Sequence, residues 1–152
     1  MDDATFWSLI DKFDWSKDED DDAIIEPAVL ALALLPDSQI AGFQQTLARR
    51  LYDLDGRAWA RESGAEIWLG DPDRVAVDGF LYARCLVVAN GREFYDAVKA
   101  DPTTFPKDAD FEAILMLAAD AYDRKTGLVW EELDDTDVSY ETFSNEAGWP
   151  AI

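Results

Sequence analysis

Residues 26–54 read EPAVLALALLPDSQIAGFQQTLARRLYDL, and this stretch decides the fold class. Its first part, Ala28 to Leu35, is apolar on nearly all sides when drawn as a helix, which indicates a helix buried at the centre of the protein. Glu26-Pro27 opens this predicted helix, because proline is tolerated in a first helical turn, and Pro36 ends it.

A second helix follows directly, from about Ser38. The apolar residues on one of its faces recur at spacings of three and four: Ile40, Phe43, Leu47, Leu51 and Leu54. Asp37 or Ser38 is expected to cap its start. Two ends fit the sequence, one at Asp55-Gly56 and one through Trp59.

Four further stretches carry the same helical spacing, at about residues 6–13, 77–90, 92–100 and 111–127. Asp2 or Asp3 suits the start of the first, and Asn90-Gly91 and Gly127 suit helix ends. A strand is the competing interpretation for Cys85 to Val88. Helical periodicity therefore extends over most of the chain.

These patterns predict a mainly α protein, built as a single-domain orthogonal bundle of about five to six helices with an irregular C-terminal tail. The length of 152 residues suits one domain with a real core. We expect a helical domain at residues 1–127 and an acidic, aromatic tail at residues 128–152 that packs on it.

The net charge of −20 limits the classes of partner. Contacts to nucleic acid phosphates need Lys and Arg, and an anionic membrane repels an acidic protein, so neither partner is expected. A basic protein remains as a class of partner. The alternative is that the charge serves only solubility. The acids crowd the two ends: residues 1–26 carry ten acids and two bases, and residues 101–152 carry thirteen and three. If the ends lie together, they form one acidic surface.

The absence of histidine and the single cysteine, Cys85, restrict the chemistry. They leave no catalytic Ser-His-Asp or Cys-His group and no usual zinc site. One cysteine makes no internal disulfide, and the chain shows neither a signal peptide nor a long apolar run, so we expect a cytoplasmic protein.

The run Lys17 to Asp22 holds five adjacent acids, and their mutual repulsion predicts a solvated loop. A calcium-binding loop starting at Asp18 needs a glycine at its sixth position and a glutamate at its twelfth, where this chain has Ala23 and Val29. No metal site and no cofactor are therefore expected.

Several short motifs resemble the family called domain of unknown function 4240. They are Phe6-Trp7-x-x-Ile10-Asp11, Val77-Asp78-Gly79-Phe80-Leu81-Tyr82-Ala83-Arg84, Gly91-Arg92-Glu93-Phe94-Tyr95, Asp101-Pro102 and Tyr122 to Gly127. The chain departs from the family pattern at Val77, where a further Asp is common, and at Leu86, where a Trp is usual. The resemblance implies a mostly helical fold in a bacterial cytoplasm and implies no reaction.

The most informative polar residues are Asp78, Arg84 and Arg92, which interrupt otherwise apolar helices. An Arg paired with Asp orients a carboxylate or phosphate ligand, or fixes helix packing as a structural ion pair; we favour the structural role. Trp59 and Trp68 are candidate contacts to a ligand or partner, with core packing as the alternative.

Three functions compete on this evidence. The first is a protein-binding module, resembling an inhibitor, an immunity protein or a DNA mimic, that docks a basic partner through its acids. The second is a helper subunit or homo-oligomer without chemistry of its own. The third is a histidine-independent enzyme that uses Asp78, Arg84 and Arg92. We rank them in that order.

Overall fold

A computed structural model describes residues 1–17, 19–71, 74–132 and 135–151 of the chain. Its α-helices are α1 (Asp3–Ile10), α2 (Asp21–Ala33), α3 (Asp37–Asp53), α4 (Arg57–Ala60), α5 (Val77–Ala89), α6 (Arg92–Ala100) and α7 (Leu117–Thr126). Short 3-10 helices lie at Trp15–Lys17, Pro102–Thr104, Glu112–Met116 and Glu146–Gly148. Two strands, β1 (Trp68–Asp71) and β2 (Arg74–Val75), pair antiparallel with Trp68 opposite Val75. The predicted mainly helical single-domain fold is confirmed.

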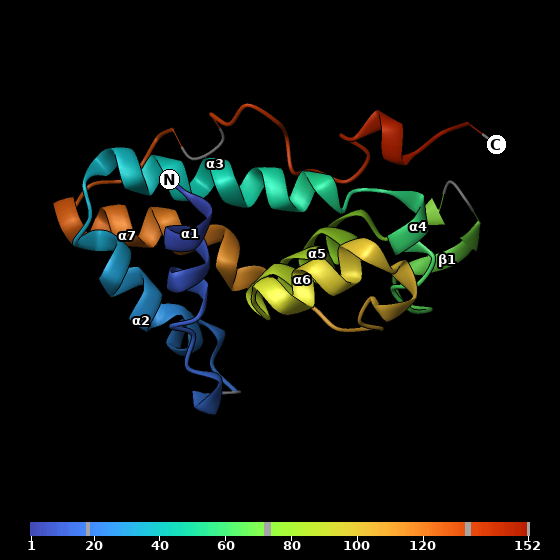
Figure 1. Cartoon of the computed structure of the whole chain (residues 1–152), viewed down its shortest axis with the longest axis horizontal. Coiled ribbons are helices and arrows are strands. Elements are labelled where there is room, and N and C mark those ends of the chain that lie inside the picture. Colours follow the sequence, from blue (N-terminus) through green and yellow to red (C-terminus); the bar gives the residue numbers. More distant parts are fainter. Residues whose placement is uncertain (18, 72–73, 133–134, 152) are drawn as a thin grey trace.

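Helix α3 is the longest of these helices and runs along the long axis of the molecule (Figure 1). Its 17 residues span about 25 Å at 1.5 Å per residue. Phe43, Leu47 and Leu51 have no exposed surface, so the predicted apolar face is the buried one. The expected cap at Asp37 or Ser38 is wrong: Pro36 occupies that position, and no side chain caps the helix.

Helix α2 corrects two predictions. It begins at Asp21, six residues before Pro27, so the acids of the run start a helix instead of forming a loop. Asp20 caps it by accepting a hydrogen bond from the Ala23 backbone N–H at 3.0 Å, and early acids are stabilised by the positive end of the helix dipole. Asp18, within the same run, lies outside the described residues.

The apolar run of α2 is less buried than its composition predicts. Ala28, Val29 and Leu32 lie in the core, but Leu30 is 47 % exposed and Leu34, just after the helix, is 87 % exposed. Neighbouring elements cover only part of α2, because helices at the edge of a small protein keep one side in water.

The chain after Asp53 changes direction several times before the next long helix. Helix α3 ends at Asp53, and α4 is a separate single turn. The segment Cys85 to Val88 is helical within α5, so the competing strand interpretation is wrong. Gly91 adopts φ +92° between α5 and α6, a conformation that favours glycine, and this fixes the predicted break.

Helix α7 packs beside α2 and under α3, so the beginning and the later part of the sequence meet (Figure 1). The helix predicted from Phe111 starts as a 3-10 turn at Glu112–Met116 and becomes α-helical at Leu117. Gly127, with φ +69°, ends it as predicted. Residues 128–132 and the segment from residue 135 then run back along α3 (Figure 1).

Candidate functional site

The three polar residues singled out in the sequence do not meet. Asp78 is exposed in the first turn of α5, Arg92 is exposed in α6, and Arg84 has no exposed surface. Within the described ranges no hydrogen bond or ion pair joins any two of them, and Arg92 instead faces Asp96, with Nε 3.6 Å from Oδ2. A fully buried Arg84 has no surface with which to touch a ligand.

Arg84 instead fastens the C-terminal segment to the core. Its Nη1 donates to the Leu51 carbonyl at 2.8 Å, and its Nη2 donates to the Thr142 hydroxyl at 3.0 Å. The guanidinium lies 4.9 Å from the centre of the Phe80 ring. Burial lowers the pKa of Arg84, and the charge of Asp55 is the largest influence in the opposite direction.

Asp55 is the residue that sequence reasoning missed. It is fully buried, and its carboxylate accepts hydrogen bonds from Phe143 N at 3.1 Å, Asn145 N at 2.9 Å and Trp149 Nε1 at 2.8 Å. These donors lie about 90 residues later in the chain, so an isolated Asp-Gly motif gave no signal beyond a turn. Asp55 and Arg84 together have a structural role.

The two candidate tryptophans lie in different elements. Trp59, half-buried in α4, donates its indole N–H to the Val98 carbonyl at 2.9 Å and lines an open hollow of about 510 Å³ with Asn145. Trp68, in β1, lies against the guanidinium of Arg61 at 5.8 Å and is not among the residues lining that hollow. They do not form a shared aromatic site.

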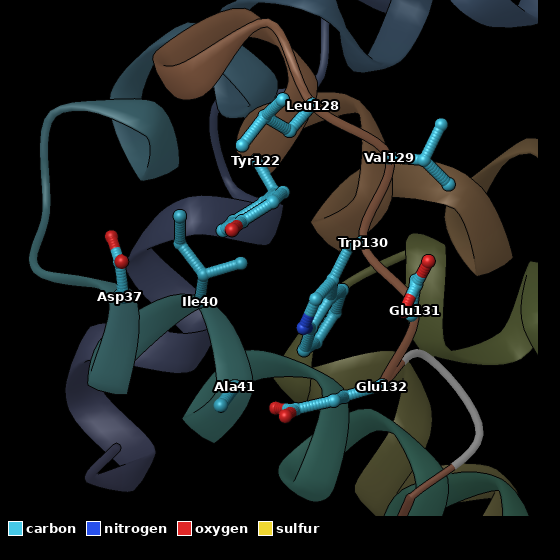
Figure 2. Close-up of a pocket in the computed structure, with 9 residues that line it drawn as sticks. All are labelled: Asp37, Ile40, Ala41, Tyr122, Leu128, Val129, Trp130, Glu131 and Glu132. Carbon is cyan, nitrogen blue, oxygen red and sulfur yellow. The ribbon is translucent and has the colours of Figure 1, made fainter.

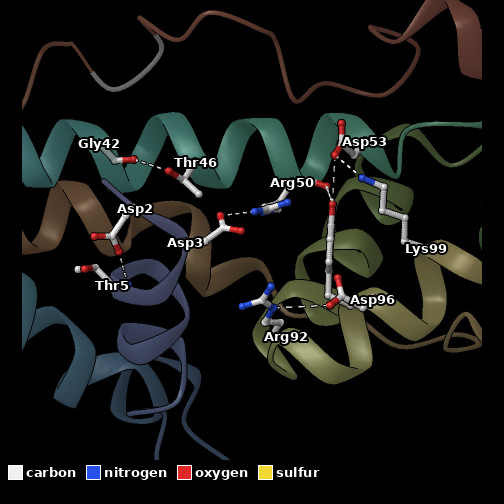
Figure 3. A network of polar contacts seen from close by, with 11 residues as sticks. Asp2, Asp3, Thr5, Gly42, Thr46, Arg50, Asp53, Arg92, Asp96 and Lys99 are labelled. Atoms are coloured by element: carbon white, nitrogen blue, oxygen red, sulfur yellow. Dashed lines mark hydrogen bonds and ion pairs between the residues drawn. The ribbon is translucent and has the colours of Figure 1, made fainter.

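Acids near the C-terminal end of α3 are paired with bases (Figure 3). Arg50 binds the carboxylate of Asp3, and Lys99 Nζ lies 2.6 Å from Asp53 Oδ2. The Arg50 guanidinium also lies 5.5 Å from the centre of the Tyr95 ring. These two acids therefore do not add unpaired negative charge to this part of the surface.

The surface over α2 and α7 is different, and we call it the acidic face. It consists of Asp20, Asp21 and Asp22 at the start of α2, Asp110, and Asp120 and Asp123 in α7. All six residues are exposed, and among the described residues none of them forms an ion pair. Three acids from the first part of the chain and three from residues 110–123 are thus brought to one surface.

Two pKa shifts report how closely these acids approach one another. Partial loss of contact with water, followed by the charges of Asp110 and Asp22, raises the pKa of Asp21. Partial burial, followed by the charges of Asp22 and Asp123, raises the pKa of Asp120. Carboxylates from α2 and α7 therefore repel one another across the boundary between the helices.

Two basic residues of α7 beside this face already have partners. Arg124 makes a two-pronged contact with Glu26, with Nη1–Oε1 at 2.6 Å and Nη2–Oε2 at 3.2 Å. Lys125 Nζ lies 2.6 Å from Asp37 Oδ1 and donates to the Leu35 carbonyl at 2.8 Å. The acidic face consequently keeps its negative charge.

A second feature is a groove between α3 and the segment that follows α7 (Figure 2). Its larger hollow has a volume of about 510 Å³, and the rings of Tyr122 and Trp130 lie there with centroids 6.3 Å apart. A smaller hollow of about 210 Å³ adjoins it and shares Ala41, Trp130 and Glu132. The carboxylates that line the two hollows are Asp37, Glu131, Glu132 and Asp135, and neither is lined by a Lys or Arg.

Other kinds of site find no support in the described ranges. No three His, Cys, Asp or Glu residues there are grouped to hold a metal ion. Burial raises the pKa of the Cys85 thiol to about 12, so this cysteine is a poor nucleophile. No helix in the same ranges is both long and apolar enough to cross a membrane.

Comparison with known proteins gives a family and no activity. A family model described as "Protein of unknown function (DUF4240)" matches residues 1–124, which includes α1 to α6 and most of α7. No curated protein and no solved structure matches the chain.

Proposed function

The chain belongs to the DUF4240 family of proteins of unknown function, and we propose that this member is a protein-binding module that docks a basic partner. The contact is made by the acidic face, in the manner of an inhibitor, an immunity protein or a DNA mimic. The partner supplies Lys and Arg side chains, and the bacterial cytoplasm is the proposed location.

One observation carries the proposal: carboxylates from α2 and α7 gather on one surface although partial burial, and then repulsion between neighbouring acids, raises the pKa of Asp21 and of Asp120. Keeping like charges together lowers stability, so a surface of this kind is better explained by a ligand than by folding. A basic partner relieves the repulsion when it binds. Long-range attraction between opposite charges also accelerates association.

The test compares two variants that change the net charge equally. The first, Asp21→Asn, Asp120→Asn and Asp123→Asn, neutralises half of the acidic face. The matched control neutralises three exposed acids on other elements: Asp11→Asn, Glu66→Gln and Glu93→Gln. Each tagged protein is incubated with host lysate and washed at low and at high salt.

We expect the wild type and the control to retain one basic protein in stoichiometric amount, and the acidic-face variant to lose it. Retention weakens at high salt, because contacts between exposed charges are screened beyond about 10 Å at 0.1 M salt. Equal loss in both variants would mean that only the net charge matters, and capture of no specific protein would refute the proposal.

Self-association is a second candidate function, supported by a cluster of exposed apolar residues. Leu34 is 87 % exposed, Val129 is 84 % exposed and Leu128 is 61 % exposed. The hydrogen bond from Lys125 Nζ to the Leu35 carbonyl brings the end of α7 next to the end of α2, so the three residues share one corner of the molecule. Light scattering distinguishes the candidates: a stable dimer that Val129→Ser and Leu128→Ser convert to a monomer would support self-association.

A further inference from the structure

The groove between α3 and residues 128–132 with Asp135 has the chemistry of a cation-binding site. Of its four carboxylates, only Asp37 has a basic partner among the described residues, at Lys125. The carboxylate of Glu132 points toward α3 at Ala41, beside the Trp130 ring (Figure 2). Aromatic faces attract cations, so carboxylates beside Trp130 favour an ammonium or guanidinium group over a neutral or anionic ligand.

The wall formed by the C-terminal segment is held in place before any ligand arrives. The side-chain amide of Gln45 in α3 binds two backbone groups of this segment. Its Nε2 donates to the Asp135 carbonyl at 3.0 Å, and its Oε1 accepts from the Asp137 N–H at 3.0 Å. The Trp130 ring in addition packs against the ring of Tyr122 in α7. A preformed groove loses less conformational entropy when it binds a ligand.

The two hollows share Trp130 as a lining residue and are offset along α3. The larger one reaches Asp37 and Ile40, and the smaller one reaches Gln44 and Gln45. An offset of about one helical turn corresponds to roughly 5–6 Å. Alternate side chains of an extended peptide lie on one side, roughly 6.7 Å apart, so they match this offset and adjacent side chains do not.

We propose that this groove binds an extended segment of the basic partner in which two Lys or Arg residues are separated by a single residue. One cationic side chain enters each hollow, and the Trp130 ring, which lines both hollows, is in reach of each. The inference rests on the proposed function and names the recognised segment.

The test uses two synthetic peptides of identical composition and charge, acetyl-Gly-Lys-Thr-Lys-Gly-amide and acetyl-Gly-Lys-Lys-Thr-Gly-amide. Binding to the full chain is followed by nuclear magnetic resonance, on the indole N–H signal that Trp130→Leu removes. We expect the alternating peptide to shift this signal and to bind about fivefold more tightly than its isomer, since only one of them fills both hollows.

Variants separate recognition by the groove from general attraction. Glu131→Gln with Glu132→Gln changes two exposed side chains and should abolish the difference between the peptides. Glu66→Gln with Glu93→Gln, which makes the same change of charge elsewhere, should preserve it. Equal affinity of the two peptides for the wild type, or an unchanged difference in the groove variant, would overturn the inference.

The same variants distinguish failure here from failure of the proposed function. If the groove variant still retains the captured basic protein while the acidic-face variant loses it, the acidic face binds the partner and the groove does not. The peptide comparison needs no captured partner, so its result stands apart from the pull-down.

Discussion

Replacing the buried carboxylate of Asp55 by an amide is the sharpest test of how the C-terminal segment is held. Asp55→Asn preserves the volume of the side chain, so no cavity confuses the result. Oδ1 continues to accept from Phe143 N and Trp149 Nε1, but an amide NH₂ replaces the oxygen that lies 2.9 Å from Asn145 N. Two donors then face each other.

The expected loss follows from two changes. A hydrogen bond to a charged group contributes about 1.5–3 kcal/mol, and its replacement by a contact between two donors removes at least that. Arg84, which has no exposed surface, also loses its strongest opposing charge. Among the described residues no ion pair joins Arg84 to Asp55, so this loss is smaller than the roughly 3–5 kcal/mol of a broken buried pair, and we expect the free energy of unfolding to fall by about 3 kcal/mol in total.

The assay is urea unfolding followed by tryptophan fluorescence, combined with chymotrypsin cleavage of the native protein. We expect earlier unfolding and faster cleavage near Phe143 in Asp55→Asn. A double-mutant cycle combines this change with Arg84→Met. The double variant should lose about 1–2 kcal/mol less stability than the sum of the two single losses, because without the Arg84 charge the opposing charge of Asp55 stabilises less. A loss under about 0.5 kcal/mol, or strict additivity, would refute this reasoning.

Three further predictions concern separate positions. Gly148→Ala should destabilise the protein by about 1–3 kcal/mol in thermal unfolding, because its Cβ would collide with the backbone carbonyl of Asp55, whereas Gly79→Ala, with only ordinary contacts in helix α5, should be neutral or stabilising. Cys85, whose thiol pKa is raised by burial to about 12, should resist a thiol reagent at pH 8 and react only in urea; reaction in the native state would contradict its burial. Asp120→Asn should stabilise the protein by about 0.2–0.5 kcal/mol at pH 7, since it removes like-charge repulsion. The raised pKa of Asp120 means that the folded state binds more protons, so the wild type loses stability as pH rises through that pKa, and the advantage of the variant should vanish below about pH 4.

Local pattern was sufficient for most helices. The spacing of Phe43, Leu47 and Leu51 identified the buried face of α3, and α6 begins and ends at the predicted residues, Arg92 and Ala100. Such features depend on neighbours within one or two turns, which a sequence shows directly. The start of α2 was missed because capping by Asp20 and the helix dipole outweigh repulsion between adjacent acids.

The family was also recognisable from short motifs, and a match over residues 1–124 confirms it. Those motifs drew attention to Asp78, Arg84 and Arg92, but a motif does not show which side chains meet. In the structure Arg84 donates a hydrogen bond to Thr142 of the C-terminal segment and feels the charge of Asp55. These interactions join positions far apart in the chain.

The sequence by itself determined the helical class, the net charge of −20 and the crowding of acids at the two ends of the chain. Only the tertiary structure decided that some acids of both regions meet, because packing of α7 against α2 brings Asp120 close to Asp22. Composition adds charges without regard to position, whereas the field that a partner meets depends on the distances between them.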